Sequence, residues 1–226
     1  MALNLVKGQS ESISSNITKL RVGLGWEPNQ SLSNHDFDLD VSAFMLGENG
    51  KVINENYLVF YNSELRVLPN NLLNLEPYNP TKYPNKEKDY RLKTRPVDPD
   101  FSIHGSVDDT SGNVSDGGDD ENLNINLGKI SPLVKEIIIV ASIYEYDIRK
   151  QNFGQVRSSY IRVVDDNDNS EIAKYELGED FSIETAVEFG RLYKRNGAWK
   201  FEASGIGYKK DLSYFVEKYF QGEIIK

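Results

Sequence analysis

The stretch that decides the fold is Asp36-Phe-Asp-Leu-Asp-Val-Ser-Ala-Phe-Met-Leu46. Its first residues alternate between acidic and apolar side chains, and this period of two is typical of a β-strand with one face in the core. The stretch then becomes continuously apolar. We therefore predict a strand over residues 36–46, with Phe37 and Leu39 entering the core and the carboxylates on the opposite face.

Further strands are predicted on both sides of this stretch. Residues 19–24 alternate apolar and polar, and Arg195-Asn-Gly197 is a strong hairpin signal between two apolar segments. The other predicted strands cover residues 57–61, 137–146, 160–164, 172–177, 187–193 and 199–204. Eight or more short strands separated by turns indicate an all-β protein, a two-sheet sandwich or a barrel. One helix is expected over Asp211–Gln221, where apolar residues recur at helical spacing behind the N-cap Asp211.

Residues 63–113 differ from the rest of the chain. They contain six of the eight prolines and show little regular hydrophobic period. We interpret them as a long loop with at most one edge strand, inserted into a single domain that spans residues 1–226. Long loops in compact domains are usually functional or disordered, so this segment is a candidate contact surface.

The composition limits the possible functions. The chain has 226 residues, 26 basic and 35 acidic side chains, a net charge of −9 and no cysteine. The acidity argues against nucleic acids and anionic membranes as partners, because both need clustered Lys and Arg. The lack of cysteine excludes disulfides, thiolate metal sites and a cysteine nucleophile. The longest apolar run is too short to span a membrane, and the start lacks a secretory pattern, so we expect a cytoplasmic protein.

The first acidic constellation is Asp36, Asp38 and Asp40, which share one face of the predicted strand. Three like charges about 7 Å apart repel one another, and a strand is a poor place for Asp, so the pattern suggests a cation partner. The alternative is an exposed strand face where charge prevents edge-to-edge aggregation.

The second constellation is Asp116-Gly-Gly-Asp-Asp-Glu121. Its glycines allow backbone carbonyls to turn toward a ligand, and Ca²⁺ takes about six to eight oxygen ligands. The alternative is an ordinary polar loop. The two clusters could meet at one end of a sandwich, where loops gather. The spacing is not that of an EF-hand, because Val41 stands where the glycine belongs, and nucleotide-loop and hydrolase signatures are missing.

Several sequence blocks, in order along the chain, resemble the TerD family of tellurium-resistance and general stress proteins. The blocks include Arg21-Val-Gly-Leu-Gly-Trp26, Phe37–Phe44, Leu58–Asn62, Gly118–Glu121, Gln151–Val156, Tyr160–Asp165 and Gly205–Tyr208. The resemblance implies a β-sandwich that binds Ca²⁺ at one end and a cytoplasmic role in chemical stress, without an established catalytic activity. Against this family, residues 63–113 are longer than expected.

The resemblance also implies a set of calcium ligands. They are Asp38, Asp40, Asn62, the carbonyl of Gly118, Asp119, Asp120, Glu121 and Glu145. Spacing alone also indicates Asp38, Asp40 and residues 118–121, and it adds Asp36, whereas Asn62 and Glu145 come from the resemblance. We expect two calcium ions at this acidic end.

The leading hypothesis is a non-catalytic, calcium-binding signalling or scaffold module. Its expected partners are calcium ions and other stress-response proteins, with no nucleic acid and no membrane insertion, and an oligomer remains open. One alternative is a metal-independent interaction module that uses residues 63–113. A metal-dependent hydrolase is the least favoured alternative, because no base, nucleophile or substrate pocket can be named. Without cysteine, thiol capture or reduction of tellurium oxyanions is implausible.

Overall fold

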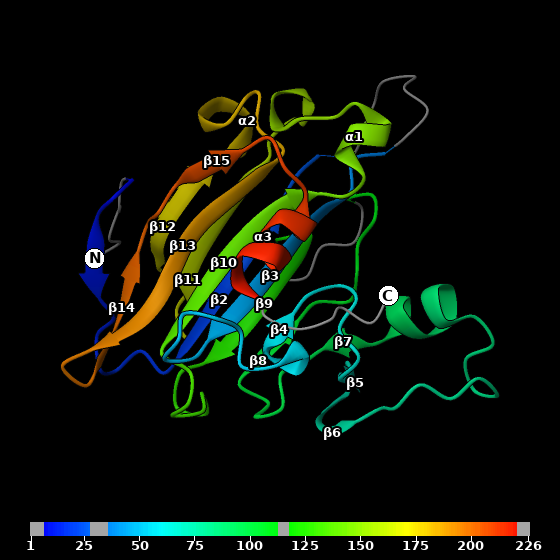
Figure 1. Ribbon diagram of the computed structural model, residues 1–226, viewed down its shortest axis with the longest axis horizontal. Coiled ribbons are helices and arrows are strands. Elements are labelled where there is room, and N and C mark those ends of the chain that lie inside the picture. The colour runs from blue at the N-terminus through cyan, green and yellow to red at the C-terminus, as the bar shows by residue number, and fades with distance from the viewer. Residues whose placement is uncertain (1–6, 28–35, 113–117, 221–226) are drawn as a thin grey trace.

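The computed structural model describes residues 7–27, 36–112 and 118–220, and in this part of the chain strands dominate (Figure 1). Two antiparallel sheets pack face to face, with the hydrophobic core between them. The predicted all-β sandwich with a C-terminal helix is confirmed. No helix in the described ranges is long and apolar enough to cross a membrane.

The larger sheet has seven strands and contains the apolar stretch with which the sequence analysis began. Its order is β1 (Ser10–Ser12), β14 (Ala198–Glu202), β13 (Ala186–Arg195), β10 (Glu136–Ile143), β3 (Leu39–Leu46) and β4 (Leu58–Val59), with β15 (Ile206–Tyr208) also beside β13. Strand β3 lies between β10 and the short edge strand β4 and is buried along its whole length, which explains its continuously apolar second half. It begins at Leu39, so Asp36 and Asp38 precede the strand and the predicted start at residue 36 was too early.

The smaller sheet has five strands. Its order is β12 (Glu171–Glu176), β11 (Tyr160–Asp165), β2 (Lys19–Gly25), β9 (Glu121–Asn126) and β8 (Ile103–Gly105). On β2 the apolar residues Leu20, Val22 and Leu24 are fully buried, and Arg21 and Gly23 alternate with them. Strand β9 was not predicted, although Asn-Leu-Asn-Ile-Asn alternates with the required period of two.

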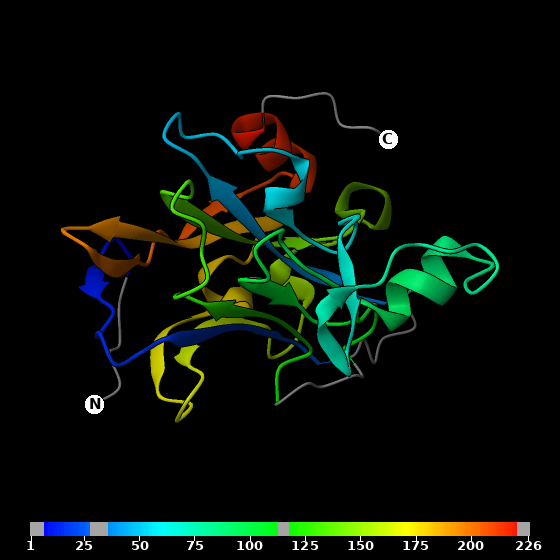
Figure 2. The same ribbon diagram turned by 90° about the horizontal axis from the view of Figure 1, so that it is seen from below.

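Residues 63–112 are more ordered than the loop predicted for residues 63–113. They form a third antiparallel sheet of β6 (Asn71–Leu75), β5 (Arg66–Leu68) and β7 (Arg95–Pro96), and they also supply β8 to the five-stranded sheet. A π-helical turn (Lys86–Tyr90) and a 3₁₀ turn (Arg91–Lys93) connect β6 to β7. Figure 2 shows this third sheet beside the sandwich. The segment's short strands and scattered prolines left no period that the sequence analysis could detect.

The chain contains further short helical elements. The remaining ones are a 3₁₀ turn at Glu55–Tyr57, α1 (Tyr146–Arg149), a 3₁₀ turn at Phe153–Gln155, α2 (Leu177–Asp180) and α3 (Leu212–Tyr219). The Asp211 side chain accepts a hydrogen bond from the Tyr214 backbone N–H, as the N-cap prediction requires. Helix α3 covers the outer face of the seven-stranded sheet, where Phe215 and Tyr219 pack on Phe44 (Figure 1).

Candidate metal centre

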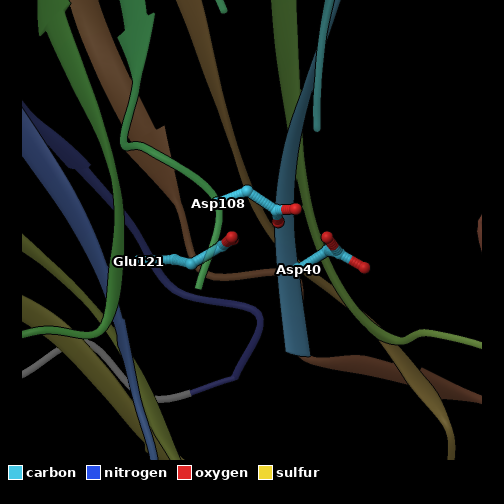
Figure 3. Close-up of side chains that lie close together, drawn as sticks. All are labelled: Asp40, Asp108 and Glu121. Atoms are coloured by element: carbon cyan, nitrogen blue, oxygen red, sulfur yellow. The ribbon is translucent and has the colours of Figure 1, made fainter. Parts of the chain in front are cut away.

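Three acidic side chains from separate parts of the chain converge beside β3. Asp40 lies on β3, Glu121 is the first residue of β9, and Asp108 lies in the connection between β8 and β9. One carboxylate oxygen from each residue lies within 4.8 Å of the other two. Figure 3 shows the three side chains close together beside the strand. We call Asp40, Asp108 and Glu121 the acid triad.

The open edge of β3 explains how Glu121 reaches this place. Strand β4 is so short that it pairs only with Ala43 and Phe44. Beyond its end, the Val41 backbone N–H donates to Glu121 Oε2 at 3.0 Å, so a side chain from the other sheet satisfies the uncovered edge. The carboxylate of Glu121 is therefore fixed against β3, next to Asp40.

Burial dominates the electrostatics of the acid triad. Asp40 and Glu121 are only 4% and 5% exposed, and burial raises the pKa of both carboxyls well above their usual range, with the neighbouring carboxylates adding to the shift. Burial also raises the pKa of Asp108, whose side chain shares a hydrogen bond with Glu121. Such a bond between two carboxyl groups needs a proton on one of them. Among the described residues, no Lys or Arg nitrogen lies within 4.0 Å of the three carboxylates.

Asp38 adds a fourth acidic side chain beside the acid triad, near the C-terminal end of β10. Burial, followed by the negative charge of Asp108, raises the pKa of Asp38 to about 7, although Arg149 opposes this shift. The Arg149 guanidinium lies 3.6 Å from the Asp38 carboxylate. The Asp38 backbone carbonyl accepts the Tyr144 N–H at 2.9 Å, which fixes the residue beside the sheet. Asp38 is therefore a buried acid whose charge, among the described residues, Arg149 compensates in part.

Asn62 offers an amide oxygen in the same part of the molecule. Its Oδ1 is buried and has no hydrogen-bond partner among the described residues. Such an atom costs free energy unless it binds something. Tyr61, the preceding residue, lies close enough to the acid triad that the charges of Asp40 and Asp108 help raise its pKa, after the larger effect of burial.

A buried arginine holds the backbone on both sides of Asn62. Arg66 is 1% exposed, and its guanidinium donates to the carbonyls of Tyr61 (2.8 Å) and Ser63 (3.4 Å). Its other nitrogens donate to Thr94 Oγ1, the Thr94 carbonyl and the Arg91 carbonyl at 2.7, 2.8 and 3.0 Å. Arg66 therefore ties the Asn62 backbone to the third sheet, a role that no local sequence signal indicated.

The structure places Asp119 among arginines. Its carboxylate pairs with the Arg21 guanidinium and lies 2.8 Å from Arg162 Nη2, and Tyr160 Oη lies 2.9 Å from the same carboxylate. A Cβ atom on Gly23 would meet the Asp119 carboxylate at 2.2 Å, so the glycine makes room for this side chain over β2. Asp119 is fully buried, and its negative charge is matched by two positive ones.

Two neighbours of Asp119 are held by backbone contacts. Asp120 Oδ2 accepts the Trp26 backbone N–H at 2.8 Å, and burial raises the Asp120 pKa. The Gly118 carbonyl lies 2.8 Å from the Tyr160 hydroxyl. Gly118 has a φ of 94°, a left-handed conformation that glycine adopts without strain.

The two remaining predicted ligands lie toward α1. Glu145 precedes α1 with a φ of 50°, and its exposed carboxylate lies 3.5 Å from Arg149. A positive φ at a non-glycine residue is uncommon and often marks a functional constraint. Asp36 is exposed, and its backbone carbonyl accepts a hydrogen bond from Gln151 Nε2 at 3.2 Å. The structure thus brings Asp40 and Glu121 together and places Asp36 and Asp119 in other contacts.

Asp108 was missing from the predicted ligands. It belongs to the acidic run between Asp98 and Glu121, but no spacing rule distinguishes it from its neighbours in that run. Its position depends on β8, a strand that the sequence analysis treated as loop. The acidic composition was therefore the only available signal.

The donor set fits a hard divalent cation. All candidate ligand atoms are oxygens, the type that Ca²⁺ and Mg²⁺ prefer. Ca²⁺–oxygen distances of about 2.3–2.6 Å put ligand atoms on one ion within about 5 Å of each other, and the acid triad meets this limit. The buried, unpartnered Oδ1 of Asn62 adds a neutral oxygen nearby.

Comparisons with known proteins define the class. A model of the TerD domain matches residues 1–89 and 94–219, and the chain belongs to this family of tellurium-resistance and stress-response proteins. It is 38% identical over 224 residues to the tellurium resistance protein TerD of Alcaligenes sp, and 35% identical over 224 residues to general stress protein 16U of Bacillus subtilis (strain 168). Each alignment covers 97% of this chain and 97% of the relative.

A solved structure supports the fold. The crystal structure of a homologue of telluride resistance protein (TerD) from Streptomyces coelicolor A3(2) superposes with a TM-score of 0.64 at 18% sequence identity. The superposition covers 88% of this chain and 95% of the other. At this level of identity the likeness concerns the sandwich itself.

Proposed function

We propose that this protein is a calcium-binding, non-catalytic stress-response module that acts in the cytoplasm through other stress-response proteins. The observation that carries the proposal is the acid triad, in which Asp40 and Glu121 are buried and no Lys or Arg nitrogen of the described residues lies within 4.0 Å of any of its carboxylates. Burying like charges together is costly unless a cation compensates them. Bound Ca²⁺ would supply that positive charge.

The proposed ligands come from this chain alone. Asp40, Asp108 and Glu121 would hold one ion, and Asn62 Oδ1 and Asp38 are further candidate ligands. Asp120 and Glu145 remain proposed ligands for a second ion, so that the whole acidic end takes two. In this arrangement the ion is structural, because it joins β3, β9 and the connection before β9.

Thermal unfolding with EDTA and then with excess Ca²⁺ tests the proposal. At 100 times the dissociation constant, binding adds about 2.7 kcal/mol to the free energy of unfolding. For a domain of this size, that gain raises the Tm by about 5–10 °C. Metal analysis by mass spectrometry should give two calcium ions per chain. An unchanged Tm at millimolar Ca²⁺ would contradict the proposal.

Matched substitutions locate the ligands. Asp40→Asn and Asp108→Asn should each abolish most of the calcium-dependent Tm shift. The exposed Asp147 serves as the control. Asp147→Asn removes the same charge outside the acid triad and should keep the calcium-dependent Tm shift. Asp120→Asn tests the second ion, because it should lower the calcium stoichiometry from two to one.

A second candidate function follows from exposed leucines on the third sheet. Leu73 and Leu75 on β6 are 70% and 46% exposed, and β6 is an edge strand of its sheet. An exposed apolar edge strand can pair with a strand of a partner protein. Replacing Leu73 and Leu75 by Thr should reduce capture of such a partner and leave the calcium-dependent Tm shift unchanged.

A further inference from the structure

A second, separate site lies on the outer face of the five-stranded sheet. A groove of about 640 Å³ runs there over β2, β9 and β8 and is bounded by β6 of the third sheet. Its basic side chains are those of Lys19, Arg21, Arg95 and Lys129, whereas Asp166 is its one carboxylate among the lining residues that the structure describes. The groove is therefore positively charged on a chain whose net charge is −9.

Two of these cations have no counter-ion. Arg21 pairs with Asp119 and Asp166. By contrast, Lys19 and Lys129 are exposed, and within the described ranges neither has a carboxylate oxygen within 4.0 Å. Like charges held in one groove repel one another, and a bound anion would compensate them.

The sheet register brings both lysines to the same asparagine. Lys19 on β2 is directly opposite Asn126 on β9, and the Lys129 backbone N–H donates to the Asn126 carbonyl in the turn that follows. In the neighbouring row, Asn124 lies opposite Arg21 on one side and His104 on the other. This face thus presents amide and cationic N–H donors, the groups that bind phosphate oxygens.

The far side of the groove is apolar. Leu72 and Leu73 of β6, together with Phe101, form this wall. The wall is tied to the sheet because His104 Nε2 and the Leu72 carbonyl oxygen lie 3.1 Å apart. A groove of this volume, with polar groups on one side and apolar groups on the other, matches small-molecule sites, which are about 300–1,000 Å³.

We propose that this groove binds a small phosphorylated organic molecule. The phosphate lies between Lys19 and Lys129 at Asn126, and the organic part packs against Leu72, Leu73 and Phe101. This site uses none of the calcium ligands, so it can be tested without reference to the metal centre.

Isothermal titration with three probes tests both halves of the proposal. AMP carries a phosphate and a ring system, adenosine carries only the ring system, and inorganic phosphate carries only the anion. The titrations are run at about 0.15 M salt, where exposed charges are screened beyond about 8 Å. We expect saturable binding of AMP at one site per chain, with adenosine and inorganic phosphate each at least about tenfold weaker.

A double substitution assigns the site. Lys19→Gln with Lys129→Gln should weaken AMP binding at least about tenfold, because two charge-assisted contacts are lost. The control pair Lys88→Gln with Lys210→Gln removes the same charge from exposed lysines outside the groove and should leave the affinity within about twofold. An equal loss of AMP affinity in both double variants would overturn the proposed site, because AMP would then be attracted by the net charge of the protein.

Three other results would overturn the proposal. They are the lack of saturable AMP binding at millimolar concentration, equal affinities for AMP and inorganic phosphate, and binding of a glutamate-rich peptide where AMP does not bind. The last result would make the groove a protein-docking surface. Thermal unfolding of each variant, with and without Ca²⁺, confirms that the fold is intact.

Discussion

Two carboxylates only two residues apart, Asp119 and Glu121, are both buried but in opposite surroundings. Asp119 faces the outer side of the five-stranded sheet and pairs with Arg21 and Arg162. Glu121 points to the edge of β3 and lies among other acids, with Val41 N–H as its donor. A buried carboxylate can therefore be paired with basic side chains or lie among other acids. The difference is one of location, which local composition does not reveal.

Asp119→Asn should give the largest effect on stability. The substitution leaves two arginines without their shared carboxylate, and breaking a buried ion pair costs about 3–5 kcal/mol. We expect about 3 kcal/mol to be lost in urea unfolding, since Arg21 keeps Asp166 at 3.4 Å. The calcium-dependent Tm shift should persist. If Asp119→Asn kept its stability and lost the calcium-dependent Tm shift, Asp119 would be a metal ligand. The contrast between Asp119 and Glu121 would then be wrong.

Gly23→Ala tests the same region from the opposite side. The new methyl group would overlap the Asp119 carboxylate, and forced overlap in a packed site costs about 1–3 kcal/mol. Gly47→Ala is the matched control, because its Cβ would find its nearest neighbour at 3.5 Å. Chemical denaturation should show a loss of about 2 kcal/mol for Gly23→Ala and less than about 0.5 kcal/mol for the control.

Glu121→Gln should have the opposite sign in the metal-free protein. It replaces a buried carboxyl group that lies among other acids with a neutral amide and keeps an oxygen for the Val41 N–H. We expect the EDTA-treated variant to be more stable than the parent by about 1 kcal/mol, with most of the calcium shift lost. Glu48→Gln, at a side chain that is 89% exposed, is the control. A destabilised metal-free variant would show that the acid triad is compensated without a cation.

The metal-free protein should also show a pH dependence of its stability. Because the pKa of Asp38 is about 7 in the folded chain and about 4 in the unfolded one, the folded state binds more protons between these values. Stability should therefore fall as the pH rises through this window, by up to about 1.4 kcal/mol per pH unit for each retained proton. Saturating Ca²⁺ displaces these protons, so the slope in thermal unfolding should flatten. A rising slope in EDTA would contradict the assignment.

The sequence predicted the strands whose periodicity is strong and missed those that depend on context. The hairpin at Asn196-Gly197 and the buried strand β10 follow from local signals. Strands β5 to β8 are two to five residues long and gain their structure from pairing, so no local period identifies them. The short pattern Asn-Leu-Asn-Ile-Asn of β9 has the period of two that is typical of a strand, although this strand was not predicted.

The candidate site was predictable only in part for the same reason. Asp40 and Glu121 lie in acidic motifs, and their meeting follows from the packing of two sheets. Asp108 depends on the path of the segment after β8, and the pairing of Asp119 depends on arginines that lie 98 and 43 residues away in the chain. Sequence spacing along one segment carries no information about partners at such distances.

The Arg66 contacts have a consequence for protein engineering. Its guanidinium joins residues 61–63 to residues 91–94, so both anchors are needed for the backbone around Asn62. The two ends of the segment between these anchors lie close together, because β5 and β7 are paired strands. An exchange of residues 69–89 for a short linker would leave both anchors in the chain, whereas Tyr90 must stay, because its carbonyl accepts the Thr94 hydroxyl. A foreign domain inserted into the third sheet would therefore be attached next to the acidic end of the sandwich.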